Sequence, residues 1–423
     1  MTRRGTIAVV ALLLFAGFMT WRFVRPMNIF VVSKAFERPI STTQIPNGVR
    51  TLSAAECGSC HGEMLEEWRS SIHHAAWTDP YFQADFRFDG SQQICKNCHT
   101  PLDRQQDATV LGFYDAAKWH PILAPNSEFD SSLQSEGVTC AACHVKDGAV
   151  LGPYGSDTAP HPVMELDNPN QICLRCHVVG GNRWDTFYKM PPCGTVAEIW
   201  AGDTPPPASR DAQPGRGASG EITAPDAAAL GCVECHMPLV QRPLVEGGVI
   251  RDVRQHLWRG GHDPEMVRQA LAIALNEAPA AAGQRRFVLS VENIGAAHFL
   301  PTGTPDRHLL LRLRLLDDRA NVLAEQEEKL VRTILWRPFI ADLWDTRLPR
   351  GQSHSIELAF PAQATPSERM VEARVSYFLV DDRRRRRIGY EDAKAIGYEV
   401  FHRTLSLDTG INGLNPQSSG ATQ

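Results

Sequence analysis

The sequence predicts a multidomain chain with an N-terminal membrane-anchor helix, a mainly α-helical and irregular middle domain, and a C-terminal antiparallel β-sandwich. Three observations support this prediction. Residues 7–21 are almost wholly apolar, the middle of the chain carries the motif C-x-x-C-H five times, and after Gly283 apolar residues alternate with other residues. A period of two is typical of strands that bury one face.

The C-x-x-C-H motifs indicate the chemistry of the middle domain. They are Cys57-Gly-Ser-Cys60-His61, Cys95-Lys-Asn-Cys98-His99, Cys140-Ala-Ala-Cys143-His144, Cys173-Leu-Arg-Cys176-His177 and Cys232-Val-Glu-Cys235-His236. Two thiols at this spacing can form thioethers to the two vinyl groups of a haem, and the next histidine then lies under the iron as its proximal ligand. C-x-x-C alone also serves zinc and redox sites, but five copies that each continue with His favour haem. The sequence therefore predicts five covalently bound haem c groups.

Length and charge narrow the class of protein. At 423 residues the chain is long enough for two or three domains. Its net charge is −5 and each haem adds two propionates, so nucleic acid is not an expected partner, whereas charged redox proteins are. Cys193 is the one cysteine outside the motifs. We interpret it as a buried or unreactive thiol, with an axial thiolate or an intermolecular bond as the alternatives.

Residues 1–32 are predicted to form a signal anchor or transmembrane helix. A basic start precedes the apolar run from Ile7 to Trp21, and a second apolar patch covers residues 27–32. A run of about 15 residues is short for a membrane span and also suits a cleaved signal peptide, but no small-x-small cleavage site follows it. We therefore favour an uncleaved anchor with Trp21 and Arg22 at the membrane interface. Because c-type haem is attached after export, the bulk of the chain is expected outside the cytoplasm.

The haem domain is predicted over residues 51–282, after a polar linker at residues 33–50. Its helices are expected to be short, because Gly, Pro and Asn recur between the motifs. The segment from Glu56 to His73 is predicted as one helix that opens with the first motif. Residues 205–228 are rich in Pro, Ala and Gly and are interpreted as a surface excursion. Another helix is predicted from the capping pattern at Asp263 to a point near Pro279.

Residues 283–407 are predicted as the β-sandwich and residues 408–423 as a disordered tail. Apolar side chains alternate at Phe287, Leu289 and Val291, and the same spacing recurs over residues 311–315, 356–360 and 371–379. Several such strands in succession are typical of an antiparallel sandwich. The charged run from Asp381 to Arg387 is expected to form a hairpin tip, either solvated or docked on acidic groups of a partner.

A second axial ligand would close each iron to substrates, and ten histidines outside the motifs are candidates for that position. They are His73, His74, His120, His161, His256, His262, His298, His308, His354 and His402.

Several stretches around these histidines resemble elements of the cytochrome c-554-like multihaem cytochromes. Trp68-Arg-Ser-Ser71-Ile-His73-His74-Ala-Ala76 is similar to the W-x-x-S-x-H-x-x-A element of that family. Further similar stretches are Cys98-His99-Thr-Pro101-Leu, Gly137-Val-Thr-Cys140, Cys235-His236-Met-Pro238, Arg254-Gln-His256-Leu-Trp-Arg-Gly-Gly261-His262 and Asn293-Ile-Gly-Ala-Ala-His298-Phe-Leu-Pro301-Thr-Gly303. The resemblance covers most of residues 50–310, and it implies that His73, His256, His262 and His298 are distal haem ligands.

The fifth distal ligand is less constrained. His161, in Ala159-Pro-His161-Pro, is our candidate. His74 is the alternative to His73, because adjacent residues on a helix point about 100° apart and only one should face a given iron. His120 ranks below these, as does ligation by Met164 or Met190. The remaining histidines, at 308, 354 and 402, lie in predicted strands and are expected to be core or surface residues.

Two functions remain open from the sequence. The first is a pentahaem cytochrome, without a catalytic residue, that transfers electrons between a membrane redox partner such as a quinone-linked complex and extracytoplasmic donors or acceptors. Its helix would sit in the inner (cytoplasmic) membrane, with the haem and β domains in the periplasm, alone or as a subunit of a larger assembly. The second is an oxidoreductase that acts on a small nitrogen or sulfur compound at one haem with an open sixth position. The sequence lacks C-x-x-C-K, which counts against the lysine-ligated haem of pentahaem nitrite reductases.

Overall fold

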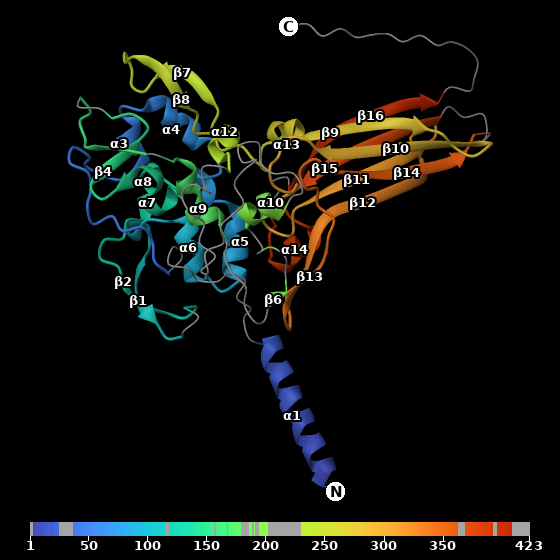
Figure 1. The fold of residues 1–423 in the computed structure, drawn as a ribbon, viewed down its shortest axis with the longest axis horizontal. Coiled ribbons are helices and arrows are strands. Elements are labelled where there is room, and N and C mark those ends of the chain that lie inside the picture. Colours follow the sequence, from blue (N-terminus) through green and yellow to red (C-terminus); the bar gives the residue numbers. More distant parts are fainter. Residues whose placement is uncertain are drawn as a thin grey trace.

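The structure, a computed structural model, describes residues 3–24, 37–115, 118–155, 158–166, 168–178, 186–187, 190, 194–201, 230–362, 369–391 and 396–407. Within these ranges the chain forms a projecting N-terminal helix, a helical module and a β-rich module (Figure 1). Cys193, the apolar patch at residues 27–32, the excursion at 205–228 and the tail at 408–423 lie outside the described residues.

Helix α1 (Arg3–Val24) projects from the base of the molecule (Figure 1). It contains 22 residues, and its most apolar stretch has a mean hydropathy of 2.1. Among the described helices it is the one that is long and apolar enough to cross a bilayer. A helix of this kind near the N-terminus is compatible with a membrane anchor and with a signal sequence.

The helical module is built from short helices and small sheets, as its many helix-breaking residues predict. Its helices are α3 (Ala54–Gly58), α4 (Gly62–Arg69), α5 (Pro80–Phe88), α6 (Gln93–His99), α7 (Ser131–Ser135), α8 (Cys140–His144), α9 (Asn170–His177), α10 (Thr195–Ala201), α12 (Cys232–His236) and α13 (Pro264–Ala270), with 3-10 turns η1 (His74–Ala76) and η2 (Asp103–Gln105). Its sheets pair β1 (Ala108–Phe113) with β2 (Pro121–Pro125), β3 (Val145–Lys146) with β4 (Ala149–Gly152) and β5 (Val163–Glu165), and β7 (Leu239–Pro243) with β8 (Ile250–Arg254).

The single helix predicted from Glu56 to His73 is wrong, because the chain forms α3 and α4 with a turn between them. His61 leaves the helical region, with φ −104° and ψ 54°. The turn brings α4 back against α3 at Gly58, where an added Cβ would lie 2.2 Å from the Leu65 side chain. Close packing of the two short helices therefore replaces one continuous helix.

The β-rich module contains two sheets. The smaller has the strand order β14 (Ser353–Pro361), β10 (Gln284–Asn293), β9 (Leu271–Ala278), and the larger has the order β16 (Gly397–Leu407), β15 (Arg369–Phe378), β11 (His308–Leu316), β12 (Val322–Leu335), β13 (Ile340–Asp345), β6 (Thr186–Phe187). All of these neighbours pair antiparallel except β6, which comes from the helical module and runs parallel to β13.

Side chains from both sheets meet in one hydrophobic core. The predicted inward residues Phe287, Leu289 and Val291 of β10 are buried there, together with Leu311 of β11 and Ile356 of β14. Alternation along each strand sends every second side chain into this core, which confirms the strands predicted from the period of two.

The helix predicted from Asp263 to near Pro279 is right at its start and wrong at its end. Asp263 caps α13 by accepting from the backbone amides of Glu265 and Met266. At Leu271 the chain turns into β9, whose Leu275 lies opposite Leu289 of β10. Hydrogen bonding to β10 and burial in the core override the helical periodicity, so the first strand of the sheet begins before the boundary predicted at residue 283.

The prediction that the charged run at residues 381–387 forms a hairpin tip is also wrong. Residues Asp382–Arg387 form helix α14, which Asp381 caps through the amide of Arg383 at 2.8 Å. His308, His354 and His402 lie in strands β11, β14 and β16, as predicted.

Candidate haem sites

Four of the five motifs end a short helix with their histidine. The histidine closes α6, α8, α9 and α12, whereas the first motif begins in α3 and its His61 starts α4. A helical turn places the two cysteines of a motif one turn apart and carries the next residue beyond them. All five motifs line one cavity of about 3010 Å³. Since single small-molecule sites occupy roughly 300–1,000 Å³, this cavity has room for several large cofactors.

Backbone carbonyls orient most of the motif imidazoles. His61, His99, His144 and His236 place Nδ1 at 2.9, 2.6, 2.8 and 2.6 Å from the carbonyl oxygens of Leu244, Ala76, Leu151 and Arg259. A carbonyl can only accept, so Nδ1 carries the proton and Nε2 keeps its lone pair for a metal. This donor set fits haem iron.

Three motif histidines lie opposite a histidine from elsewhere in the chain. The ring centroids are 6.3 Å apart for His177 and His73, 5.9 Å for His144 and His256, and 6.4 Å for His236 and His298. Two imidazoles that bind one iron from opposite sides have centroids roughly 6 Å apart, because each metal–nitrogen bond is about 2 Å long. Each of the three spacings therefore fits one iron between the rings.

Burial keeps these imidazoles neutral. It lowers the pKa of His73 to about 3, with the nearby His177 and His236 lowering it further. Burial likewise lowers the pKa of His256 and of His298 to about 4, against the raising effect of their carbonyl contacts. Only the neutral imidazole has a lone pair for iron, so the protonation state matches the spacing.

The segment after α4 presents His73 and turns His74 away. Trp68 is buried and donates from Nε1 to the carbonyl of Val138 at 2.8 Å. Ser71 accepts from the amide of His74 at 3.3 Å. The His74 ring packs on Trp68, with centroids 4.3 Å apart, while the His73 ring faces His177. The structure thus brings His73, and not His74, opposite a motif.

His256 is held by residues that sequence reasoning missed. Its amide donates to Glu67 at 2.8 Å, and its Nδ1 lies 3.0 Å from the carbonyl of Arg254. Glu67 is fixed in turn by two hydrogen bonds from Arg242, at 2.6 and 2.8 Å. Glu67 and Arg242 lie far apart in the chain, so no local sequence signal pairs them.

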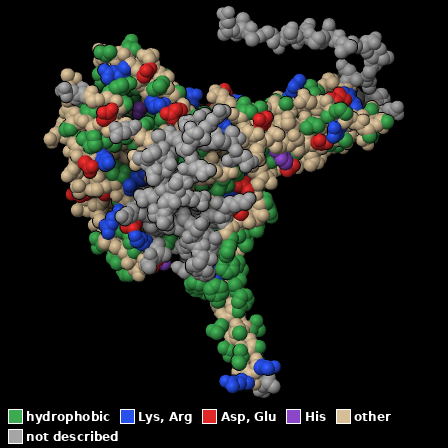
Figure 2. Space-filling view, in the orientation of Figure 1, with side chains coloured by type: hydrophobic (Ala, Val, Ile, Leu, Met, Phe, Trp, Pro, Cys, Tyr) green, Lys and Arg blue, Asp and Glu red, His purple; other side chains and the backbone are tan. Residues whose placement is uncertain are grey.

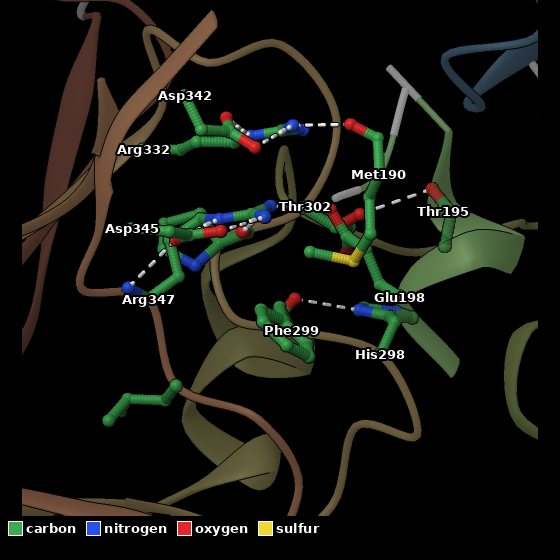
Figure 3. A network of polar contacts seen from close by, with 12 residues as sticks. Met190, Thr195, Glu198, His298, Phe299, Thr302, Arg332, Asp342, Asp345 and Arg347 are labelled. Atoms are coloured by element: carbon green, nitrogen blue, oxygen red, sulfur yellow. Dashed lines mark hydrogen bonds and ion pairs between the residues drawn. The ribbon is translucent and has the colours of Figure 1, made fainter. Parts of the chain in front are cut away.

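His298 lies beside a buried ionic network, which Figure 3 shows. Its Nδ1 is 2.9 Å from the carbonyl of Phe299, and the guanidinium of Arg347 lies 5.2 Å from the Phe299 ring. Arg347 pairs with Glu198 of α10 at 2.5 Å and with Asp345 of β13 at 2.7 Å. Burial raises the pKa of Glu198, although Arg347 lowers it.

The remaining motif histidines and predicted distal ligands have other surroundings. Within the described residues, no second imidazole ring lies against His61 or His99, and Phe82 stacks on His99 at 3.5 Å. His161 lines the cavity, with Nδ1 buried and without a hydrogen-bond partner in the described chain. His262 also lines it, and its Nε2 accepts from Arg307 at 3.2 Å.

Among the described residues that line the cavity, none of the lower-ranked candidates His120, Met164 and Met190 is found. His120 is exposed and pairs with Asp115, and Met164 is exposed on β5. Met190 is buried, and its carbonyl accepts from Arg332 of β12.

Contacts between cysteines show which motifs are neighbours. The first motif adjoins the third (Cys57 with Cys140), the second adjoins the fourth (Cys98 with Cys176) and the fourth adjoins the fifth (Cys173 with Cys232), because in each pair the sulfurs lie close enough for each thiol to shift the pKa of the other. Cys143 of the third motif lies close enough to both cysteines of the fourth motif that their charge raises its pKa. The fourth motif therefore adjoins three others.

Comparison with known proteins gives two informative matches. The family model for cytochrome c554 and c-prime matches residues 56–117, which contain the first two motifs. Among solved structures, the chain is similar to a penta-heme cytochrome c552 from Thermochromatium tepidum, with a TM-score of 0.59 and 17% identity over 86% of this chain and 100% of that one.

Part of the chain also matches an unrelated enzyme at low similarity. The match to a glycosyl hydrolase family 2 member from Bacteroides cellulosilyticus covers 32% of this chain and 14% of that one, with 11% identity and a TM-score of 0.18. No curated protein matches the sequence. The likeness to the penta-heme protein shows a shared fold, and the family model matches the attachment motifs of haem c. Together these findings show that the chain shares the fold of a penta-heme cytochrome c552 and that residues 56–117 are similar to the cytochrome c554 and c-prime family.

Proposed function

We propose that this chain is a pentahaem electron-transfer cytochrome. The observation that carries the proposal is the set of three histidine pairs, each with one motif histidine and one distant histidine at centroid spacings of 5.9–6.4 Å. A haem bound in this way supplies one-electron chemistry between ferric and ferrous iron. With both axial positions filled, no position is left for a substrate.

The ligand assignment follows from these pairs. His177 with His73, His144 with His256, and His236 with His298 would each hold one iron. His61 and His99 would hold the other two, with His161 and His262 as their second ligands, because both line the same cavity. The ten motif cysteines would carry the thioethers of five haem c groups.

The order of the motifs in space supports a branched route for electrons. The thiol contacts connect the first motif to the third and the fourth motif to the second and fifth, and Cys143 links the third to the fourth. An electron that enters at the first motif would pass the third to reach the fourth, and would leave through the second or the fifth.

The remaining parts of the proposal concern the surroundings of the haem module. Helix α1 would anchor the chain in the inner (cytoplasmic) membrane, with both modules in the periplasm. A quinone-linked membrane complex or another redox protein would exchange electrons with it, in isolation or within a larger assembly. The two sheets with one core support a β-sandwich that braces the fifth motif through His298.

A second candidate function is supported by His61 and His99. Because no second imidazole lies against either within the described residues, one of these irons could keep an open sixth position and act on a small nitrogen or sulfur compound. Added cyanide or nitric oxide would then bind to one haem.

Low-temperature electron paramagnetic resonance of the oxidised, full-length protein tests the ligand pairs. We expect at least three low-spin haems in the parent, and His256→Ala should convert one of them to high spin, because it removes one of two imidazoles. His402→Ala, on β16 of the larger sheet, is the matched control and should leave the count unchanged. If His256→Ala leaves every low-spin signal intact, the pairing is wrong. Five low-spin haems, none of which binds added cyanide, would exclude the second candidate function.

A further inference from the structure

The end of α1 and one turn of the β-rich module form a joint aromatic and basic surface. Helix α1 ends with Trp21-Arg22-Phe23-Val24, and the turn between β12 and β13 is Trp336-Arg337-Pro338-Phe339. We call these two segments, together with Phe187 of β6 and Leu335 of β12, the base surface. It draws on three parts of the chain that are far apart in sequence.

Polar and ring contacts hold the two segments together. Arg22 donates from Nε to the carbonyl of Pro338 at 2.9 Å, and its guanidinium lies 5.3 Å from the Phe339 ring. Arg337 donates in return to the carbonyl of Phe23. Phe339 also meets Phe187 edge-on, with centroids 6.0 Å apart. Arg22 is buried by these contacts and links the end of the helix to the turn.

The base surface leaves large apolar side chains in contact with solvent. Trp21, Phe23, Phe187 and Leu335, with the adjoining Leu343 and Trp344 of β13, are between 40% (Leu335) and 61% (Phe187) exposed. In Figure 2 the apolar surface of α1 continues onto the base of the β-rich module. Contiguous apolar patches of this kind mark interaction surfaces, because soluble proteins rarely leave them uncovered.

The position of the base surface along α1 indicates its partner. A helix of 22 residues is roughly 33 Å long at 1.5 Å per residue, which is close to the ~30 Å thickness of the hydrocarbon core. With Arg3 and Arg4 at one end, the other end leaves the hydrocarbon at Trp21 and Arg22. Tryptophan, other aromatic residues and arginine are the residues that concentrate at this depth. The turn joined to Arg22 therefore lies at the same level.

We propose that the base surface rests on the phospholipid interface and fixes the orientation of both modules on the membrane. The proposal depends on α1 being retained as the anchor. The apolar side chains enter the interfacial layer, and Arg337 lies among the anionic headgroups that attract it. The occupant is the bilayer because the surface continues an apolar helix of membrane-spanning length at interfacial depth.

Photo-crosslinking in the intact protein tests this surface. The full-length, haem-loaded protein is reconstituted in vesicles of phosphatidylcholine and phosphatidylglycerol, with benzoylphenylalanine in place of Leu335 or Leu343, and adducts are identified by mass spectrometry. Leu323 is the matched control, since it is similarly exposed (48%) at the other end of β12, roughly 40 Å along the strand. A probe at Phe15 within α1 reports whether the helix is in the bilayer.

We expect lipid adducts at positions 15, 335 and 343, several-fold above the yield at 323. If lipid adducts form at position 15 but the yields at positions 335 and 343 do not exceed the yield at 323, the proposal is overturned and the anchor remains intact. Adducts at 335 to a second copy of the chain, or to another protein supplied in the membrane, would also overturn it. Absence of lipid adducts at 15 would remove both the anchor and the surface, while leaving the electron-transfer proposal untouched.

Discussion

Gly137 shows how one residue without a side chain positions a candidate ligand. Its φ is +63°, in the left-handed region that favours glycine, and an added Cβ would lie 2.7 Å from the carbonyl oxygens of both His73 and His74. The next amide, that of Val138, donates to the His73 carbonyl at 2.9 Å. The backbone just before the third motif thus fixes the segment that places His73 opposite His177 of the fourth motif.

Gly137→Ala should therefore lower stability and disturb His73. A left-handed conformation alone costs roughly 1–2 kcal/mol for a residue with a Cβ, and the two carbonyl clashes add to that cost. We expect a lower free energy of unfolding and a weaker low-spin signal in electron paramagnetic resonance. Gly62→Ala is the control, because nothing lies within 4 Å of its added Cβ. If the two variants behave alike, the contact with His73 does not matter.

Asp306 is expected to make the stability of the protein depend on pH. Burial raises the pKa of Asp306 to about 6, against the lowering effect of Arg384, whereas an unfolded Asp has a pKa of about 3.9. Between about pH 4 and pH 6 the folded state binds more protons than the unfolded state, so this group's contribution to stability falls as pH rises.

Asp306→Asn should remove that contribution. Relative to the parent, the variant should gain stability between pH 4 and pH 7, because an amide carries no charge that burial opposes. Thermal unfolding of both proteins at the two pH values measures this difference. An equal difference in Tm at pH 4 and pH 7 would show that Asp306 titrates normally.

At the level of elements, helix α14 fastens the β-rich module to α5. Arg384 of α14 pairs with Asp85 of α5 and lies 5.0 Å from the Phe88 ring. Beside it, Ile388 and Tyr390 pack against Ala84. Within the basic run, Arg384 is therefore docked on the helical module of the same chain.

Arg384→Ala should weaken this junction. It leaves Asp85 without its cation and uncovers Phe88, so we expect a loss of about 1–3 kcal/mol in the free energy of unfolding. Arg386→Ala, an exposed position of the same helix, should change it by no more than about 0.5 kcal/mol. Denaturant titration of the two variants distinguishes a docked helix from a solvated one, for which both changes would be small.

At the level of the whole molecule, a buried network ties the β-rich module to the fifth motif. Arg347 and Arg332 reach from the β-rich module to Glu198 and to the carbonyl of Met190 in the helical module (Figure 3). Phe299, beside Arg347, holds His298 opposite His236. The larger sheet and the candidate haem ligand are therefore joined through one network of contacts.

Arg347→Ala should cost about 3–5 kcal/mol of stability, since it leaves Glu198 buried without a cation. We also expect the low-spin signal of the His236–His298 pair to broaden or turn high spin, because Phe299 loses its support. Arg312→Ala, which breaks only exposed pairs with Glu325 and Glu327, should cost roughly 0–1 kcal/mol. Equal losses in the two variants would contradict a role for the network.

The sequence by itself determined the cofactor class and the strands, because both depend on short-range spacing. Cysteines three residues apart followed by histidine specify haem attachment within five residues, and a period of two specifies which side chains of β10 face the core. The helix cap at Asp263 was predictable for the same reason, because it depends on residues within one helical turn.

Only the tertiary structure decided which histidines face each other and where several elements end. His73 meets His177 across more than one hundred residues, α13 gives way to β9 because β10 lies beside it, and α14 forms against α5. These outcomes depend on contacts between distant segments, and the free energy of such contacts exceeds the local preferences that a sequence pattern records.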